Sequence, residues 1–168
     1  MFTPHADIKT LSDKRQQLMQ AMKDISELDV LVGIPEANNT RPGDPVTNAQ
    51  LAFIHTNGSP IRNIPARPFI EPAIEDDSEN ISGILAEAMA ALLEGNVTEA
   101  NQKLEMAGMQ GQRAAQLWFE KPDKNQWPEN SPATKARKLK KRATEPQPLI
   151  DTGEMRKSIT YVIRKKGS

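Results

Sequence analysis

The segment that most resembles a catalytic motif is Leu149-Ile150-Asp151-Thr152-Gly153. In aspartic proteases an apolar strand delivers such an Asp, which activates a water molecule together with a second Asp. The sequence contains no second Asp-Thr/Ser-Gly, and only 15 residues follow Gly153, too few for the flap and second half-barrel of a retroviral-type protease. We therefore expect a protein that is not an enzyme. Asp151 or Thr152 is interpreted as the N-cap of a one-turn helix, with Glu154 in its first turn.

Metal-ligating and nucleophilic side chains are sparse. There is no Cys, and the two histidines are His5 and His55, which excludes thiolate and histidine-rich metal sites. Asp76, Asp77 and Glu79 are clustered, but acids at the start of a helix mostly serve its dipole. A general base at His55 would need a partner within hydrogen-bond reach, and the sequence indicates none. We expect no catalytic residue, no metal and no cofactor.

A strongly basic run is the next candidate for binding. Ser131-Pro132 is a typical helix start, and residues 135–142 hold six Lys/Arg in eight positions: Lys135, Arg137, Lys138, Lys140, Lys141 and Arg142. Such a helix could meet DNA phosphates or an acidic partner surface, or it could be a solvated appendage. It lacks the interleaved aromatics of single-strand binders and any base-reading motif. Any contact with DNA is therefore predicted to be nonspecific.

Three further residues are interface candidates: Arg67, Phe69 and Trp127. Arg67 lies in the hexapeptide 64–69 between Pro65 and Pro68, and each proline restricts the residue before it. Its guanidinium either pairs with an acid or phosphate across an interface, or anchors the corner to Glu71, Glu75 or a helix end of its own chain. Trp127, in a polar loop, either anchors a partner or folds back on the core.

The elements that must position these residues follow from periodicity and capping. Helical spacing predicts an N-terminal helix over 7–28 and a hairpin of helices over 71–94 and 97–120, turned at Gly95. A short helix begins at Thr47, where Gln50 completes a capping box, and ends at Gly58. Its apolar contacts are expected from Leu51, Phe53 and Ile54, and Ala107, Gly108 and Gly111 are expected to let the two hairpin helices approach closely. Apolar runs predict strands at 29–34, 60–65 and 158–165.

Together these elements predict one α+β domain over residues 1–168. A small, mainly antiparallel sheet packs with the long helical hairpin and the N-terminal helix, and extended loops cover 35–47 and 121–133. The basic C-terminal segment 132–148 is expected to be an appendage that precedes the final strand.

Composition and charge narrow the function class. Apolar residues are 37% and charged residues 26% of the 168, and no apolar run approaches the ~18 residues that span a bilayer, so a soluble product without a membrane partner is expected. The net charge of zero hides an asymmetry. Residues 1–131 hold 11 Lys/Arg against 19 Asp/Glu, and residues 132–168 hold 11 against 3. Either the basic end folds back on the acidic body, or it docks on another copy or on DNA.

Several short motifs also follow one another in a characteristic order. They are the strand Val30-Leu31-Val32-Gly33-Ile34, the short helix closed by Gly58, the hexapeptide Ile64-Pro65-Ala66-Arg67-Pro68-Phe69, the hairpin, a Lys-rich segment preceded by Pro and Thr, and residues 148–155 followed by Ser158-Ile159 and a final strand. In this order the chain resembles the tail-completion (neck) proteins of long-tailed bacteriophages over most of its length.

The resemblance implies a structural virion protein at the head–tail junction, made in the host bacterial cytoplasm. Such proteins form a ring, hexameric in related tails, that completes the tail and joins it to the head connector. The implied partners are copies of itself, the tail tube or tail terminator protein, and the head connector or stopper protein. Genomic DNA could pass the basic segment nonspecifically, and the family has no catalytic residues to carry over. Two alternatives stay open: a tail terminator or head-side stopper ring protein, and a nonspecific DNA-binding accessory protein.

Overall fold

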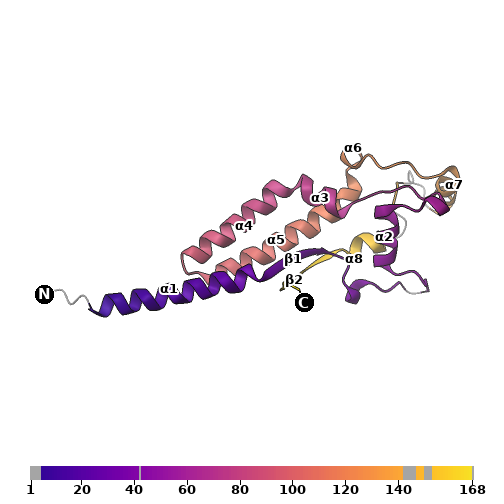
Figure 1. Ribbon diagram of the computed structural model, residues 1–168. Helices are drawn as coiled ribbons and strands as arrows, with labels where there is room; N and C mark the ends of the chain where they lie inside the picture. Colours follow the sequence, from indigo (N-terminus) through magenta and orange to yellow (C-terminus); the bar gives the residue numbers. More distant parts are fainter. Residues whose placement is uncertain (1–4, 42, 142–146, 150–152, 168) are drawn as a thin grey trace.

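Two long helices and a two-stranded sheet form the middle of an elongated α+β molecule (Figure 1). The computed structural model describes residues 5–41, 43–141, 147–149 and 153–167, with side chains from residue 11 onward and without that of Lys141. The elements in chain order are α1 His5–Ser26, β1 Leu28–Gly33, a 3-10 turn Glu36–Asn38, α2 Asn48–Asn57, a 3-10 turn Pro60–Arg62, α3 Ile70–Asp76, α4 Ser78–Leu93, α5 Val97–Leu117, a 3-10 turn Trp118–Glu120, α6 Pro122–Asn125, α7 Pro132–Lys141, α8 Glu154–Ser158 and β2 Thr160–Lys165.

The sheet joins the two ends of the chain. β1 and β2 are antiparallel, with Leu28 opposite Lys165 and Gly33 opposite Thr160, which confirms both strands and their predicted orientation. α5 contacts both strands, and α4 packs on α5 as the predicted hairpin. α1 extends past the turn between α4 and α5 at one end, while α2, α6, α7 and α8 gather at the other (Figure 1).

Local capping explains where the helices begin and end. The Thr47 hydroxyl accepts from the Gln50 N–H at 3.2 Å, and the Gln50 side chain accepts from the Thr47 N–H at 3.0 Å, forming the predicted capping box. The Asn96 side chain likewise accepts from the Glu99 N–H at 3.1 Å, at the start of α5. Gly58 closes α2 with φ of 73°, a left-handed value that favours glycine.

The core has two centres. One lies at the α2 end and is built on Phe69, Trp118, Phe119, Met155 and Ile159. The other lies where α1 crosses the hairpin, and its buried members are Ile25, Ala88, Ala91, Leu92, Ala100 and Leu104. α1 joins the second centre only through its C-terminal half, by Leu18, Ala21, Met22 and Ile25.

The small residues of α5 make room for the sheet rather than for α4 alone. A Cβ added to Gly108 would overlap the ring of Tyr161 on β2. A Cβ added to Gly111 would lie 2.8 Å from a methyl of Val32 on β1 and 3.2 Å from Ile74 on α3. The prediction that these glycines serve the contact between the hairpin helices is therefore wrong for Gly108, whereas Gly111 also faces Ile74 and Ile81 of the predicted partner helix 71–94.

Three other expectations are corrected. The helix predicted over 71–94 is broken at Asp77 (φ −107°, ψ 13°), whose carboxylate is bonded by Asn80 and Gln110 instead of solvent. Residues 60–65 form a 3-10 turn closed by one bridge between Ser59 and Ile64, because Asn63 takes the left-handed conformation (φ 51°) and turns the chain. Phe53 is 69% exposed, and the residues that α2 buries are Asn48 and Ala52.

The one-turn helix after the Asp-Thr-Gly motif is present as α8, with Glu154 in its first turn as predicted. Its N-cap position is Gly153, with φ of 80° and no side-chain cap. Asp151 and Thr152, the predicted caps, lie outside the described residues.

Candidate functional site

The corner at residues 64–69 is an internal joint. Arg67 is 5% exposed, and its Nε and Nη2 donate to the carbonyl oxygens of Pro128 at 2.8 Å and Glu129 at 2.9 Å. Its backbone N–H donates to the His55 carbonyl at 2.6 Å. Arg67 therefore ties α2, the corner and the loop after α6 together. Its partners are carbonyl groups of its own chain, neither an acid across an interface nor the predicted Glu71 or Glu75.

Phe69 and Trp127 complete this joint. Phe69 is fully buried and packs on Phe119 with ring centroids 5.0 Å apart. Trp127 meets Phe119 edge-on at 5.5 Å, and its Nε1–H donates to the Pro68 carbonyl at 2.9 Å. The structure thus places Arg67 and Phe69 in the interior, and it shows the half-buried Trp127 folded back on the core, the second of the two predicted alternatives.

His55 lies against the same joint. Burial lowers the pKa of His55, and the nearby charges of Arg67 and Lys138 lower it further. Its Nδ1 is buried and has no hydrogen-bond partner among the described residues. The arrangement favours the neutral imidazole, which fits the structural role expected for it.

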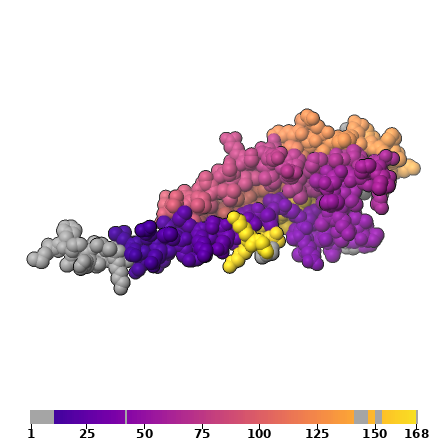
Figure 2. Space-filling view, viewed as in Figure 1, coloured from indigo at the N-terminus to yellow at the C-terminus, as the bar shows by residue number. Residues whose placement is uncertain are grey.

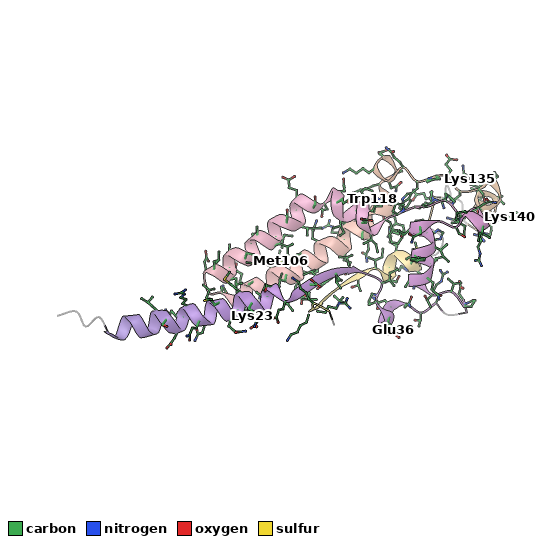
Figure 3. All side chains as sticks on the ribbon, in the orientation of Figure 1. Lys23, Glu36, Met106, Trp118, Lys135 and Lys140 are labelled. Carbon is green, nitrogen blue, oxygen red and sulfur yellow. The ribbon has the colours of Figure 1, made fainter. Side chains whose placement is uncertain are left out.

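The basic side chains of α7 fall into two groups, those bonded within the chain and those exposed to solvent. Lys138 is 8% exposed and donates to the Gln147 carbonyl at 2.7 Å, while Lys135 pairs with Glu129 at 2.5 Å. Arg137 and Lys140 are exposed at the end of the molecule opposite α1, where Figure 3 labels Lys135 and Lys140. The side chain of Lys141 and the whole of Arg142 lie outside the described residues. Lys138 therefore bonds within the basic segment 132–148, and Lys135 pairs with the loop just before it.

A cavity of about 640 Å³ lies between the aromatic joint, the loop after α6 and α7. Its walls carry apolar rings and aliphatic groups beside amides and the Lys135–Glu129 pair: Phe119, Pro122, Asn125, Gln126, Trp127, Glu129, Asn130, Lys135, Leu139, Gln147 and Pro148. Leu139 is 54% exposed at its rim. The described walls offer apolar contact and amide hydrogen bonding.

The surface that the sequence analysis did not single out is on α4. Leu85, Met89 and Leu93 are 36%, 42% and 61% exposed, although Ala88 and Leu92 of the same helix are buried in the core. Between Glu79 and Glu94 the chain has one ionisable residue, Glu87, and Lys103 pairs with it at 2.5 Å. That lack of charge around a whole helix was the available signal, because a surface helix normally has one polar face.

Two findings bear on chemistry at these surfaces. Within the residues that the structure describes, no three His, Cys, Asp or Glu side chains are grouped so that they could hold a metal ion. No helix in the described part of the chain is both long and apolar enough to cross a membrane.

Comparisons with protein-family models, with curated proteins and with solved structures find no match for this chain.

Proposed function

We propose that this chain is a structural protein of the head–tail junction of a long-tailed bacteriophage. A ring of its copies would complete the tail and join it to the head connector. The order of short motifs along the sequence supports the phage assignment, from the strand at 30–34 through the corner at 64–69 to residues 148–155. Their spacing resembles that of tail-completion proteins.

The observation that carries a role in assembly is the uncovered apolar side of α4. Monomeric soluble proteins rarely leave a contiguous apolar patch on their surface, and such patches mark contacts with other molecules. Here Leu85, Met89 and Leu93 are exposed on one helix, and the chain is asymmetric in charge, acidic over 1–131 and basic over 132–168. A ring made of one kind of subunit needs two different surfaces on each copy that fit each other.

The test is a stop codon early in this gene in the parent phage or prophage, followed by negative-stain electron microscopy of the lysate. Filled heads beside unattached tails of normal length are the expected result. Abnormally long tails would shift the assignment to a tail terminator, and empty heads would shift it to a head-side stopper. Normal infectious particles would contradict all three roles.

A second candidate function, nonspecific DNA binding, draws on the exposed Arg137 and Lys140 of α7. Each phosphate neutralised contributes about −0.9 to the slope of log K against log salt concentration. Lys135 and Lys138 are engaged within the chain, so Arg137 and Lys140, the exposed cations among the described side chains of α7, predict a slope of about −2. A much steeper slope for the purified protein on random duplex DNA would favour the DNA-binding function over the junction role.

A further inference from the structure

The α4 ridge, defined as Leu85, Met89 and Leu93, is an unpartnered helix face. The three side chains are four residues apart, so they form one row along the helix, and all three are exposed. The neighbouring positions Ser82, Ala86 and Ala90 are also exposed and are small. This side of α4 therefore has a ridge of large apolar side chains beside a groove of small ones, and a second helix could pack against such a surface.

The N-terminal arm, defined as residues 5–19 of α1, lacks cover in the same way. α1 contacts its own hairpin through Leu18 and the residues after it, and every side chain from Leu11 to Gln17 is exposed. Leu11 is 65% and Met19 is 59% exposed. In Figure 2 the indigo part of α1 begins beyond the end of the hairpin and then runs against it, and of the described side chains of the arm Leu18 is the one packed on the hairpin core.

The arm and the ridge match in spacing and in length. Leu11, Arg15 and Met19 repeat every four residues, as Leu85, Met89 and Leu93 do. At about 1.5 Å per residue each row is roughly 12 Å long. Rows of this kind interlock when two helices pack.

The surroundings of the two rows differ in charge, since residues 5–19 hold three Lys/Arg and two Asp/Glu. Lys14 and Arg15 form no ion pair within the described part of the chain, and the same holds for Glu79 and Glu94 at the two ends of the ridge. The whole segment 70–95 holds seven Asp/Glu and no Lys or Arg. The aliphatic stem of Arg15 adds apolar contact while its guanidinium reaches an acid at the end of the ridge.

We propose that the N-terminal arm of one copy of this chain packs along the α4 ridge of a neighbouring copy. This inference rests on the proposed assembly into a ring. The arm cannot serve its own ridge, because α1 crosses its own hairpin at the buried Ala88, Ala91 and Leu92 and then leads away from it (Figure 1). The contact is heterologous, arm to ridge, so it repeats from copy to copy and closes a ring when the rotation allows.

The absence of cysteine from the chain makes the contact directly testable by disulfide trapping. Leu11→Cys and Met89→Cys are prepared as separate proteins of different mass, mixed, oxidised mildly with diamide and followed on non-reducing gels. Ile61→Cys, at a position 97% exposed on another part of the surface, replaces Met89→Cys in the control mixture. We expect the arm–ridge heterodimer to form at least about tenfold faster than the control pair, because bound neighbours raise the local concentration.

Three results would overturn the proposal: equal rates for the two mixtures, a Leu11→Cys homodimer as the main product, or a wild-type chain that does not self-associate at millimolar concentration. The homodimer would indicate arm-to-arm pairing instead. As a second measurement, Met89→Lys should weaken self-association in sedimentation by about tenfold, because it places a charge in the apolar contact, whereas Ile61→Lys should not.

The cross-linking experiment and the stop-codon experiment can fail independently of each other. Specific arm–ridge cross-links together with normal particles would contradict the proposed function and support the arm–ridge contact. Unattached tails together with no cross-linking above the control would support the proposed function and contradict the arm–ridge contact.

Discussion

Arg67 shows how a residue suited to binding a partner can be used inside the subunit. Its guanidinium is buried and donates to two carbonyl oxygens of a loop 61 and 62 residues further along the chain. Burial lowers the pKa of Arg67, but an arginine guanidinium remains protonated in proteins. A buried charge with well-placed acceptors holds a loop in one position, and here that loop carries Trp127 and one wall of the cavity.

Replacing Arg67 should therefore cost stability. Arg67→Ala leaves the Pro128 and Glu129 carbonyls without their donor and opens a cavity, and we expect a loss of about 2–4 kcal/mol in the free energy of unfolding measured in urea. Arg41→Ala is the matched control. Arg41 makes one ion pair, with Asp44 at 3.4 Å on the surface, so its loss should cost less than about 1 kcal/mol. Equal effects of the two changes would contradict the internal role of Arg67.

His55 gives the subunit a pH dependence of its own. Its pKa in the folded protein is lowered from 6.5, first by burial and then by Arg67 and Lys138. As pH falls below the unfolded pKa, the unfolded chain binds a proton that the folded chain still resists, so the free energy of unfolding falls. The stability from this group is thus fully present well above the unfolded pKa of 6.5 and decreases as the pH falls below that value.

The variant His55→Gln, followed by urea unfolding at several pH values, should flatten that decrease. Asp76 acts in a separate window, because hydrogen bonds from Lys124 and Lys121 lower its pKa below 3.8. Its contribution is lost only when the pH falls below that value. A slope between pH 7 and 5 that is the same in His55→Gln and in the wild type would show that another group titrates there.

At the scale of elements, α5 is the helix on which the others depend. It contacts α4, α3 and both strands, and its glycines face side chains of the sheet. Gly108 sits under the ring of Tyr161, whose hydroxyl donates to Glu105 on the same helix at 2.7 Å. The close approach of helix and strand therefore requires the absence of a side chain at position 108.

Alanine substitutions at two helical glycines should accordingly change the free energy of unfolding in opposite directions. Gly108→Ala pushes the Tyr161 ring off α5, and we expect it to lower the free energy of unfolding by about 1–3 kcal/mol. Gly83→Ala on α4 meets nothing within 4 Å, so the gain in helix propensity should stabilise by up to about 1 kcal/mol. Thermal or urea unfolding of the two variants measures both. A stabilising Gly108→Ala would mean that α5 and β2 lie further apart than described.

Local helix caps can be predicted from the sequence, whereas the long-range contacts of Arg67 cannot. Thr47 with Gln50, and Asn96 with Glu99, interact over three residues, so such patterns are visible locally, and the predicted capping box at Thr47 is confirmed. The α+β class and the antiparallel pairing of the terminal strands are also confirmed. The partners of Arg67 lie more than 60 residues away, and no local pattern indicates them. The same holds for which face of α4 the core covers, because both faces are apolar in sequence.

At the scale of the whole molecule, the two ends are built differently. At the α2 end, aromatic packing and long-range hydrogen bonds fix loops and short helices around a core. At the other end, a single helix leaves the body with no covering element. A subunit of this form should have a well-packed end and a weakly held end, so opening free energies should differ accordingly along the chain.

Limited proteolysis of the isolated protein should reveal this difference. Trypsin is expected to cut first after Lys14 and Arg15, because exposed helix near a chain end opens most easily. The sites at Lys103 and Arg113 on α5 should resist, since that helix is packed on α4 and on both strands.

The fragment that begins after Arg15 keeps Leu18, Met22 and Ile25 in the core, so it should unfold cooperatively with a midpoint close to that of the full chain. Mass spectrometry of early fragments measures the order, and early cleavage at Lys103 would show that the hairpin, rather than the arm, is the weakly held part. Under conditions in which copies associate, the same cuts after Lys14 and Arg15 should slow, because an arm seated on a neighbouring α4 ridge is no longer free to enter the protease.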